Sequence, residues 1–141
     1  MEIYLPPNHK NTEKRFPVVY LHLGKLGRRL GHIDQAVDLL IRQKRTVPIL
    51  LVLVQENAAG YYQEVFWDTE SMQKYAEMFV EEIILFIDQN YRTVQDPTGR
   101  INIGTGFSGC VDMYNGLKYP NKFAHLASQS SVFFGIGAVR N

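Results

Sequence analysis

The fold is decided at residues 100–110, which read RINIGTGFSGC. Arg100 to Ile103 has the apolar, β-branched pattern of a strand, and the glycines that follow permit a tight turn. The next residues have helical character as far as Lys118, and Tyr119-Pro120 ends the helix because a residue before proline avoids the helical conformation. A strand, a glycine turn and a helix in this order place backbone N–H groups at one end of a sheet.

On both sides of this stretch, strand patterns alternate with helix patterns. Compact apolar runs predict further strands over Met1–Leu5, Pro17–Leu23, Val47–Val54 and Phe123–Ala127. Apolar residues at helical spacing predict one helix from Ile33 and a longer one from Asp68 or Thr69 to Ile87. Such alternation implies right-handed crossovers between parallel strands. We therefore predict the α/β class, as a three-layer sandwich with a mainly parallel sheet, in one domain over residues 1–141.

Composition excludes several classes of function. The chain has 15 basic and 14 acidic residues, a net charge of +1, so no general field attracts nucleic acid. The longest apolar run, Ile49–Val54, is far shorter than the ~20 residues that cross a bilayer. With no signal peptide in sight, we expect a cytoplasmic protein that binds neither nucleic acid nor membranes. The single cysteine, Cys110, predicts neither a disulfide nor a zinc site, and we expect no metal or other cofactor.

Three interpretations of the glycine turn are open. In the first, Gly106-Phe107-Ser108-Gly109-Cys110 is a modified nucleophile elbow, a strained turn that exposes a serine hydroxyl, with Cys110 in place of the last glycine. In the second, Gly104–Gly109 is a G-x-G-x-x-G dinucleotide fingerprint, although no acidic residue follows about 20 positions later. In the third, the glycines only allow the helix to pack closely on the strand, and Ser108 caps the helix.

Further stretches carry a resemblance to a known family: MEIYLPP at 1–7, FPVVYL at 16–21, FWDT at 66–69, FIDQNYR at 86–92 and LKYPNKF at 117–123. Their order and spacing, over nearly all of the chain, resemble the esterase family of the α/β-hydrolase superfamily that includes esterase D, or S-formylglutathione hydrolase, and feruloyl-esterase-like enzymes. The resemblance implies a truncated α/β-hydrolase fold, equivalent to its N-terminal part, and a small carboxylic ester as the substrate.

The chain departs from this family at the site itself. Counted back from Tyr119-Pro120 without a gap, the family's nucleophilic serine falls on Gly106, and Ser108, the only plausible nucleophile, lies two residues later. The resemblance also implies an oxyanion loop at His22, Gly24 and Phe107. His22 stands one position early, which directs it to the opposite face of its strand.

The family supplies its triad aspartate and histidine from later segments, whereas this sequence ends at Asn141, so we expect an incomplete triad. His22 and His125 are poor candidates for a catalytic base, because each has a surface or core explanation. Aromatic rings at Tyr61, Tyr62 and Trp67 suit the wall of an acyl or aryl pocket, with the cover of a core edge as the alternative interpretation.

We therefore predict an esterase-like protein, a carboxylesterase-type hydrolase by resemblance, that is inactive or weakly active alone. The alternatives are a non-catalytic binding or scaffold module and, third, a dinucleotide-binding module. The last predicted strand is an open edge followed by the apolar tail Val132–Ile136. Because an open edge and an apolar patch invite pairing, we expect a homo-oligomer, most simply a two-fold dimer.

Overall fold

The computed structural model describes residues 1–22, 31–54, 69–106 and 108–131. Five strands form one sheet in the order β1-β3-β2-β4-β5. They span Glu2–Tyr4 (β1), Val18–His22 (β2), Leu50–Val54 (β3), Arg100–Thr105 (β4) and His125–Gln129 (β5). The pairs β3–β2, β2–β4 and β4–β5 are parallel, and β1 pairs with β3 antiparallel. The predicted mainly parallel sheet is therefore confirmed.

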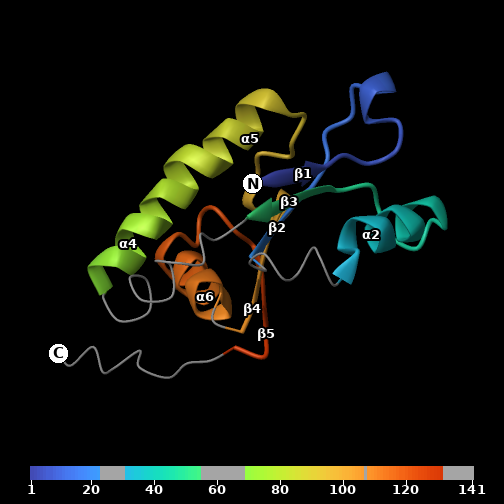
Figure 1. Cartoon of the computed structure of the whole chain (residues 1–141). Helices are drawn as coiled ribbons and strands as arrows, with labels where there is room; N and C mark the ends of the chain where they lie inside the picture. The colour runs from blue at the N-terminus through green and yellow to red at the C-terminus, as the bar shows by residue number, and fades with distance from the viewer. Residues whose placement is uncertain (23–30, 55–68, 107, 132–141) are drawn as a thin grey trace.

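The sheet carries helices on both faces, which makes three layers (Figure 1). Every residue of β2 and β3 is buried, as expected for central parallel strands covered on both sides. One face packs Tyr20 and Val52 against Phe79 and Ile87 of the helices that follow β3. The other face packs Leu21 and its neighbours against helix α2 (Ile33–Arg42), so the predicted three-layer α/β sandwich is confirmed.

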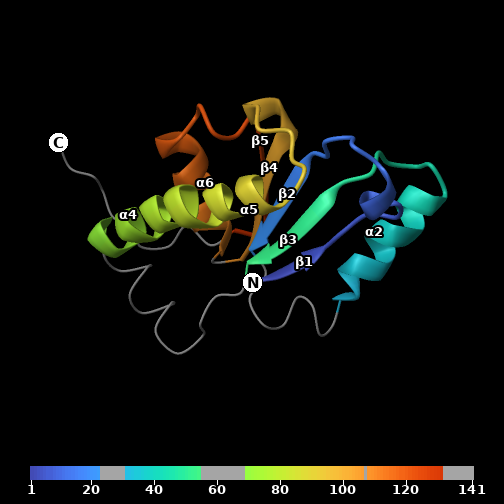
Figure 2. The same cartoon turned by 90° about the horizontal axis from the view of Figure 1, so that it is seen from above.

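A long helical rod covers the first of these faces. It consists of α4 (Thr69–Met78), a π-helical segment over Phe79–Ile84, and α5 (Leu85–Asn90), which run as one continuous body (Figure 2). Helix α6 (Ser108–Lys118) lies beside the rod on the same side of the sheet and packs on β4 and β5. No helix in the described parts of the chain is long and apolar enough to cross a membrane.

The last strand begins two residues later than its pattern predicts. The sequence places it at 123–127, whereas β5 spans His125–Gln129. Phe123 is instead a core residue, 5% exposed, and its ring lies 5.9 Å from that of Phe79 and 6.5 Å from that of Tyr20. The apolar pattern at 123–127 therefore combines two kinds of residue. Phe123 precedes the strand and is buried in the core, whereas residues 125–127 belong to β5. The tail at 132–136 lies outside the described residues.

Candidate functional site

The turn between β4 and α6 bends at Gly106. This residue has φ +62°, a left-handed conformation that side-chain-bearing residues rarely adopt. Its N–H donates to the carbonyl of Gln129 at 2.9 Å, which ties the turn to the end of β5. The N–H of Gly109 donates to the carbonyl of Gly106 at 3.3 Å, and α6 begins at Ser108. The sharp bend between strand and helix is the local context of a nucleophile elbow.

Two other glycines let the helix approach the strand. A Cβ on Gly104 would lie 2.4 Å from the carbonyl oxygen of Ser108 and 2.6 Å from the Cα of Gly109, closer than any real Cβ contact. A Cβ on Gly109 would lie 1.9 Å from the Ser131 hydroxyl. Close packing of helix on strand, the third interpretation of the motif, is therefore a real role of these two residues, and it does not exclude an elbow.

The two candidate nucleophile positions have opposite surroundings. A Cβ built on Gly106 meets no heavy atom of the described residues within 4 Å, so none of them blocks a side chain at this position. Ser108 opens α6 and is only 3% exposed. The position without a side chain is thus the open one, and the position with a hydroxyl is enclosed.

His22 ends β2 and is fully buried on the face of the sheet that carries α4 and α6. Its Nδ1 accepts from the Tyr75 hydroxyl at 3.2 Å, and its Nε2 donates to the Asn102 Oδ1 at 3.0 Å. One neutral tautomer satisfies both bonds. Burial lowers the pKa of His22 to about 4, and the hydrogen bond with Asn102 opposes this shift only in part. The imidazole is therefore a neutral core group with both ring nitrogens occupied.

Further buried polar side chains continue from Asn102 into α6. Asp112 and Asn115 are one turn apart and have no exposed surface. Burial raises the pKa of Asp112 to about 7, and the nearby Asn102 amide lowers it less than burial raises it. Nevertheless neither carboxyl oxygen of Asp112 makes a hydrogen bond of regular geometry with a described residue, and the same holds for the Asn115 amide. At neutral pH a substantial part of the Asp112 population is therefore the uncharged acid.

Of the eight residues that the sequence groups into a site, the structure describes three: Gly106 and Ser108 in the β4–α6 turn, and His22 at the end of β2. His22 pairs with Gly104, two residues before Gly106, but it points into the core. His125 is exposed at the start of β5, about 13 Å along the strand from Gln129 beside the turn. Five predicted site residues lie outside the described residues: Gly24, Phe107, Tyr61, Tyr62 and Trp67.

Sequence reasoning missed the buried polar residues beneath the turn. One signal for Asn102 was available, because it alternates with Ile101 and Ile103 in β4 and so lies on the opposite, helix-covered face. Asp112 and Asn115 share a helix face by their spacing of three residues, but spacing alone cannot say that this face meets β4 rather than solvent. The contact arises only when α6 packs on the sheet.

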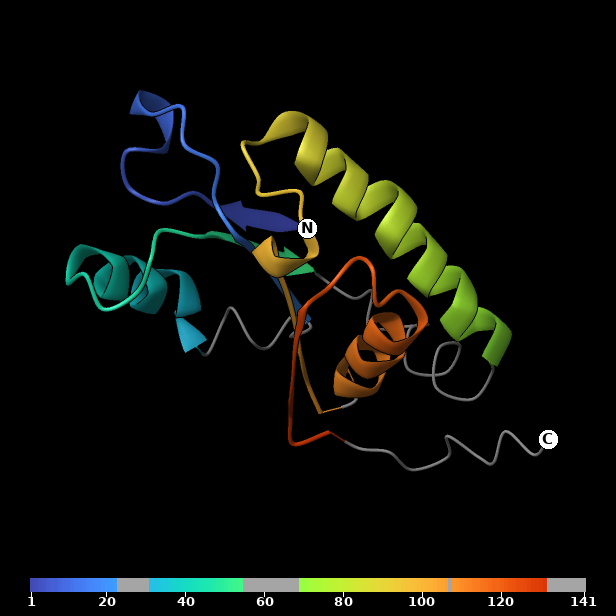
Figure 3. The ribbon, with the colours of Figure 1, turned by 180° about the vertical axis from the view of Figure 1, so that it is seen from behind.

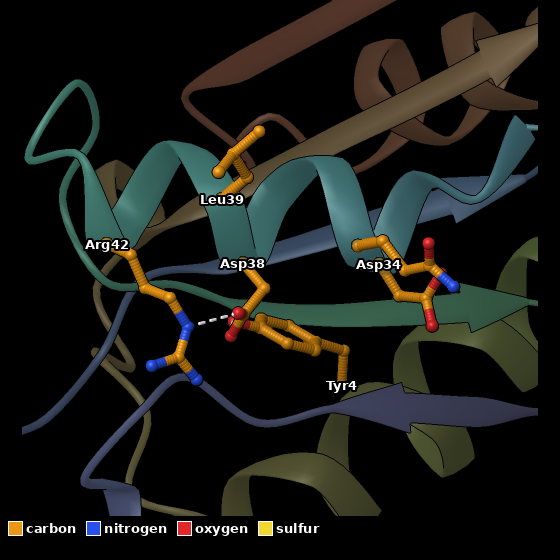
Figure 4. A pocket seen from close by; sticks show the side chains of 6 residues that line it. Tyr4, Asp34, Asp38, Leu39 and Arg42 are labelled. Carbon is orange, nitrogen blue, oxygen red and sulfur yellow. Dashed lines mark hydrogen bonds and ion pairs between the residues drawn. The ribbon is translucent and has the colours of Figure 1, made fainter.

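A hollow of about 370 Å³ lies elsewhere, between β1 and α2 (Figure 4). Asp38 stands at its centre and accepts from the Tyr4 hydroxyl at 2.8 Å and from the Arg42 Nε at 2.5 Å. Hydrogen bonds from Arg42 and then Tyr4 lower the pKa of Asp38, while burial and Asp38 raise that of Tyr4. This cluster attaches α2 to the edge of the sheet. Over the described ranges, no group of three or more His, Cys, Asp or Glu residues could hold a metal ion.

Known proteins resemble this chain over most of its length. A Bacillus subtilis protein, YbbA, is 24% identical over 94% of this chain and 56% of its own. Among solved structures, a ferulic acid esterase superposes with a TM-score of 0.73 at 20% identity, over 92% of this chain and 52% of its own. The enterobactin esterase Fes of Shigella flexneri gives 0.76 at 16% identity, over 92% and 32%. The chain thus spans about half the length of YbbA and of the ferulic acid esterase.

At these identities the structural likeness supports the fold, which is that of α/β-hydrolase esterases over the part of their length that this chain covers. The family is given by the sequence. Residues 1–138 match the family described as "Putative esterase", in agreement with the resemblance carried by the stretches between residues 1 and 123. With the fold, the bent β4–α6 turn and this match over nearly the whole chain, the protein belongs to the esterase family.

Proposed function

We propose that this chain binds small carboxylic esters as an esterase does, but that on its own it cleaves them weakly or not at all. The observation that carries the proposal is Gly106. In the frame Gly104-Thr105-Gly106-Phe107-Ser108, it stands where the motif G-x-S-x-G has its serine, at the left-handed bend of the turn. Ser108 then takes the place of the motif's last glycine.

The surroundings of the turn support this assignment. An acyl-transfer serine needs a hydroxyl at the mouth of the sheet and a histidine within hydrogen-bond reach. Gly106 has no hydroxyl, and Ser108 is 3% exposed. His22 is neutral, buried and bonded to Asn102 and Tyr75, so it is not free to take a proton from either position. The open space around Gly106 would accommodate a ligand's carbonyl group.

The experiment compares four proteins on 4-nitrophenyl acetate and butyrate: the natural chain, Ser108→Ala, Gly106→Ser and the matched Gly106→Ala. We expect the natural chain to show no turnover above Ser108→Ala. Gly106→Ser should lose about 1–3 kcal/mol of stability, because a side chain enters a left-handed conformation, and should react weakly with a fluorophosphonate probe. Gly106→Ala should lose similar stability without reacting. Saturable turnover that disappears in Ser108→Ala would overturn the proposal.

Binding needs a separate measurement. Thermal shift with an aryl carboxylic ester or its acid should raise the melting temperature of the natural chain, and the titration gives an apparent Kd. If no ester or acid shifts the melting temperature, the scaffold alternative replaces ester binding. A nucleotide that binds in a fluorescence titration would favour the dinucleotide alternative. The match of residues 1–138 to the esterase family makes this the less favoured alternative.

We also propose that the chain associates with a second copy of itself. All five residues of β5 are exposed, and no strand in the described part of the chain pairs with its outer edge. Unpaired backbone groups on a long edge favour association. A cytoplasmic location stays a prediction from the sequence.

A further inference from the structure

Four buried polar side chains beneath the β4–α6 turn come from four different elements. Tyr75 lies on α4, His22 on β2, Asn102 on β4 and Asp112 on α6. These elements meet on one face of the sheet, where α6 (orange) lies beside the helical rod (green to yellow in Figure 3). Hydrogen bonds of 3.2 Å and 3.0 Å join Tyr75 to His22 and His22 to Asn102. The four residues are called the polar chain below.

Asp112 is the last member of the polar chain. Burial raises its pKa, and hydrogen bonding with the Asn102 side chain opposes this shift, so the Asn102 amide faces the carboxyl group. The contact falls short of regular geometry, because the Asn102 Nδ2 and both carboxyl oxygens have no regular partner among the described residues. These three atoms also have almost no accessible surface, so no space beside them admits a water molecule. Buried polar groups are paired in native structures, so Asp112 and Asn102 have to satisfy each other.

An asparagine side chain can present either end of its amide. Its C=O and NH₂ groups have nearly the same size, so a half-turn of the amide exchanges an acceptor for a donor without disturbing the packing. A neutral imidazole has a similar freedom, because its one proton resides on Nδ1 or on Nε2. Asn102 and His22 can therefore respond to a change at Asp112 without any movement of the backbone.

The first arrangement of the polar chain belongs to the ionised form of Asp112. A carboxylate only accepts hydrogen bonds, so Asn102 directs its NH₂ group toward it. The Asn102 Oδ1 then faces His22 and accepts from Nε2–H, while Nδ1 accepts from the Tyr75 hydroxyl. These are the two hydrogen bonds that the structure contains.

The second arrangement belongs to the protonated form of Asp112. Its hydroxyl group is a donor, so Asn102 directs its C=O group toward it and its NH₂ group toward His22. The Nε2 atom then has to accept, so the ring proton resides on Nδ1 and is donated to the Tyr75 oxygen. Asp112 gains one proton from solvent, and the ring exchanges its Nε2 proton for one on Nδ1 and stays neutral.

We infer that the polar chain reverses the direction of its hydrogen bonds when Asp112 takes up a proton, and that the tautomer of His22 changes with it. Tyr75 changes from donor to acceptor toward the ring. The hydrogen bonding of α4 therefore depends on a proton bound on α6, across two strands of the sheet. This property does not depend on the ester binding proposed above.

The sheet brings few other titratable groups to this face. On β2 and β4 they are Tyr20 and Arg100, which alternate with His22 and Asn102 along their strands, and the Arg100 charge is paired with Asp88 at 2.5 Å. Strand β5 adds none, because Leu126 packs over α6 and the neighbouring His125 points to the opposite face. The ring of His22 stays neutral at mildly acidic pH, since burial lowers its pKa to about 4.

The helices add no unpaired charge next to Asp112. On α4 the carboxylate nearest to α6 is Glu77, which lies 3.5 Å from the Lys118 ammonium in an exposed pair. The causes that shift the pKa of Asp112 are burial and then the Asn102 amide, with no charged group among them. A titration of this site therefore reports on Asp112 itself.

Nitrogen NMR of protein labelled with ¹⁵N-histidine measures the tautomer directly, because a ring nitrogen that carries a proton resonates far from one that does not. We expect the His22 proton on Nε2 at pH 8.5 and on Nδ1 at pH 5.5, with a midpoint near pH 7, to which burial raises the pKa of Asp112. The His22 signals are those that His22→Gln lacks. The same tautomer at both pH values would overturn the inference.

Two variants test whether Asp112 is the group responsible. Asp112→Asn cannot titrate, so His22 should keep one tautomer from pH 5.5 to 8.5. Asp38→Asn removes a hydrogen-bonded carboxylate on α2, which covers the other face of the sheet, and should change its tautomer like the natural chain. Circular dichroism checks that both variants fold. A tautomer change that persists in Asp112→Asn, or one that disappears in Asp38→Asn, would overturn the coupling.

The natural chain provides a second test that needs no variant. The ¹³C signal of the Asp112 carboxyl group should titrate with the same midpoint as the His22 tautomer, because one proton controls both. Two different midpoints would overturn the inference even if the tautomer changes with pH.

Discussion

At the scale of single residues, Asp112 has the least favourable environment of the described carboxylates. It is fully buried next to Asn102, and burial raises its pKa to about 7, from 3.8 for an ordinary aspartate. Between pH 3.8 and 7 the folded chain therefore keeps a proton on Asp112 that the unfolded chain has already released. The contribution of Asp112 to stability accordingly falls as pH rises through this window, and this contribution is lost completely above pH 7.

Asp112→Asn should therefore stabilise the protein at pH 8. The pKa difference of about three units corresponds to roughly 4 kcal/mol at most, and a buried amide without partners costs about 1–3 kcal/mol of its own. We expect a net gain of about 1–3 kcal/mol at pH 8 and no gain at pH 4, measured by urea denaturation. Glu81→Gln, at an exposed position of the rod, controls for the loss of one negative charge. Equal stability of Asp112→Asn and the natural chain at pH 8 would contradict the assignment.

Among the helices and strands, α5 is attached to β4 by a buried ion pair. Arg100 donates from Nη2 to the Asp88 Oδ2 at 2.5 Å, and the Thr93 hydroxyl donates to the other oxygen at 2.6 Å. The two charged side chains are only 7% and 11% exposed. Removing one member would leave the other charge buried without its partner.

Asp88→Ala should destabilise the protein by about 3–5 kcal/mol, seen as a lower urea midpoint with an unchanged slope. The exposed pair Lys74–Glu70 on α4, at 2.6 Å, provides the control. Glu70→Ala should leave the midpoint unchanged, because solvent screens exposed pairs. Adding Arg100→Met to Asp88→Ala should recover part of the loss, and no recovery would mean that the buried charge is not its cause.

The order of these elements could be predicted from the sequence because each has a local cause. The run Val47–Val54 is apolar on both alternating faces, which is typical of a central parallel strand covered by helices, and β3 lies within it. Counting along the esterase resemblance predicts the family's nucleophile position at Gly106, which stays a prediction; the structure shows that the β4–α6 turn has its left-handed residue there. The contact of Asn102 with His22 joins residues 80 apart, and no local pattern encodes such a contact.

In the molecule as a whole, His22 and Asp112 oppose each other in pH dependence. The pKa of His22 falls to about 4 from 6.5, so the unfolded chain binds a proton that the folded chain refuses. Its contribution to stability is lost as pH falls from 6.5 through 4, whereas that of Asp112 is lost as pH rises from 3.8 through 7. Between pH 4 and 6.5 the two slopes cancel.

Removing one of these two groups should therefore change the slope of unfolding free energy against pH, with opposite signs for Asp112→Asn and His22→Gln. Relative to the natural chain, Asp112→Asn should become more stable with rising pH between 4 and 6.5, by about 1.4 kcal/mol per pH unit at most. His22→Gln should become less stable with rising pH over the same range, whatever its absolute stability. Thermal denaturation at four pH values measures both slopes, and parallel profiles would show that these groups do not titrate as described.

The close approach of α6 to β4 at Gly104 has a consequence for protein engineering. A library meant to select ester-cleaving variants from this chain gains nothing by randomising residue 104, since any side chain there displaces the backbone of Ser108 and Gly109. Random codons are better placed at 106, where a Cβ meets no described atom within 4 Å, and at 108, the buried first residue of α6. Two positions give about 400 amino-acid combinations, a number that plate assays can screen completely.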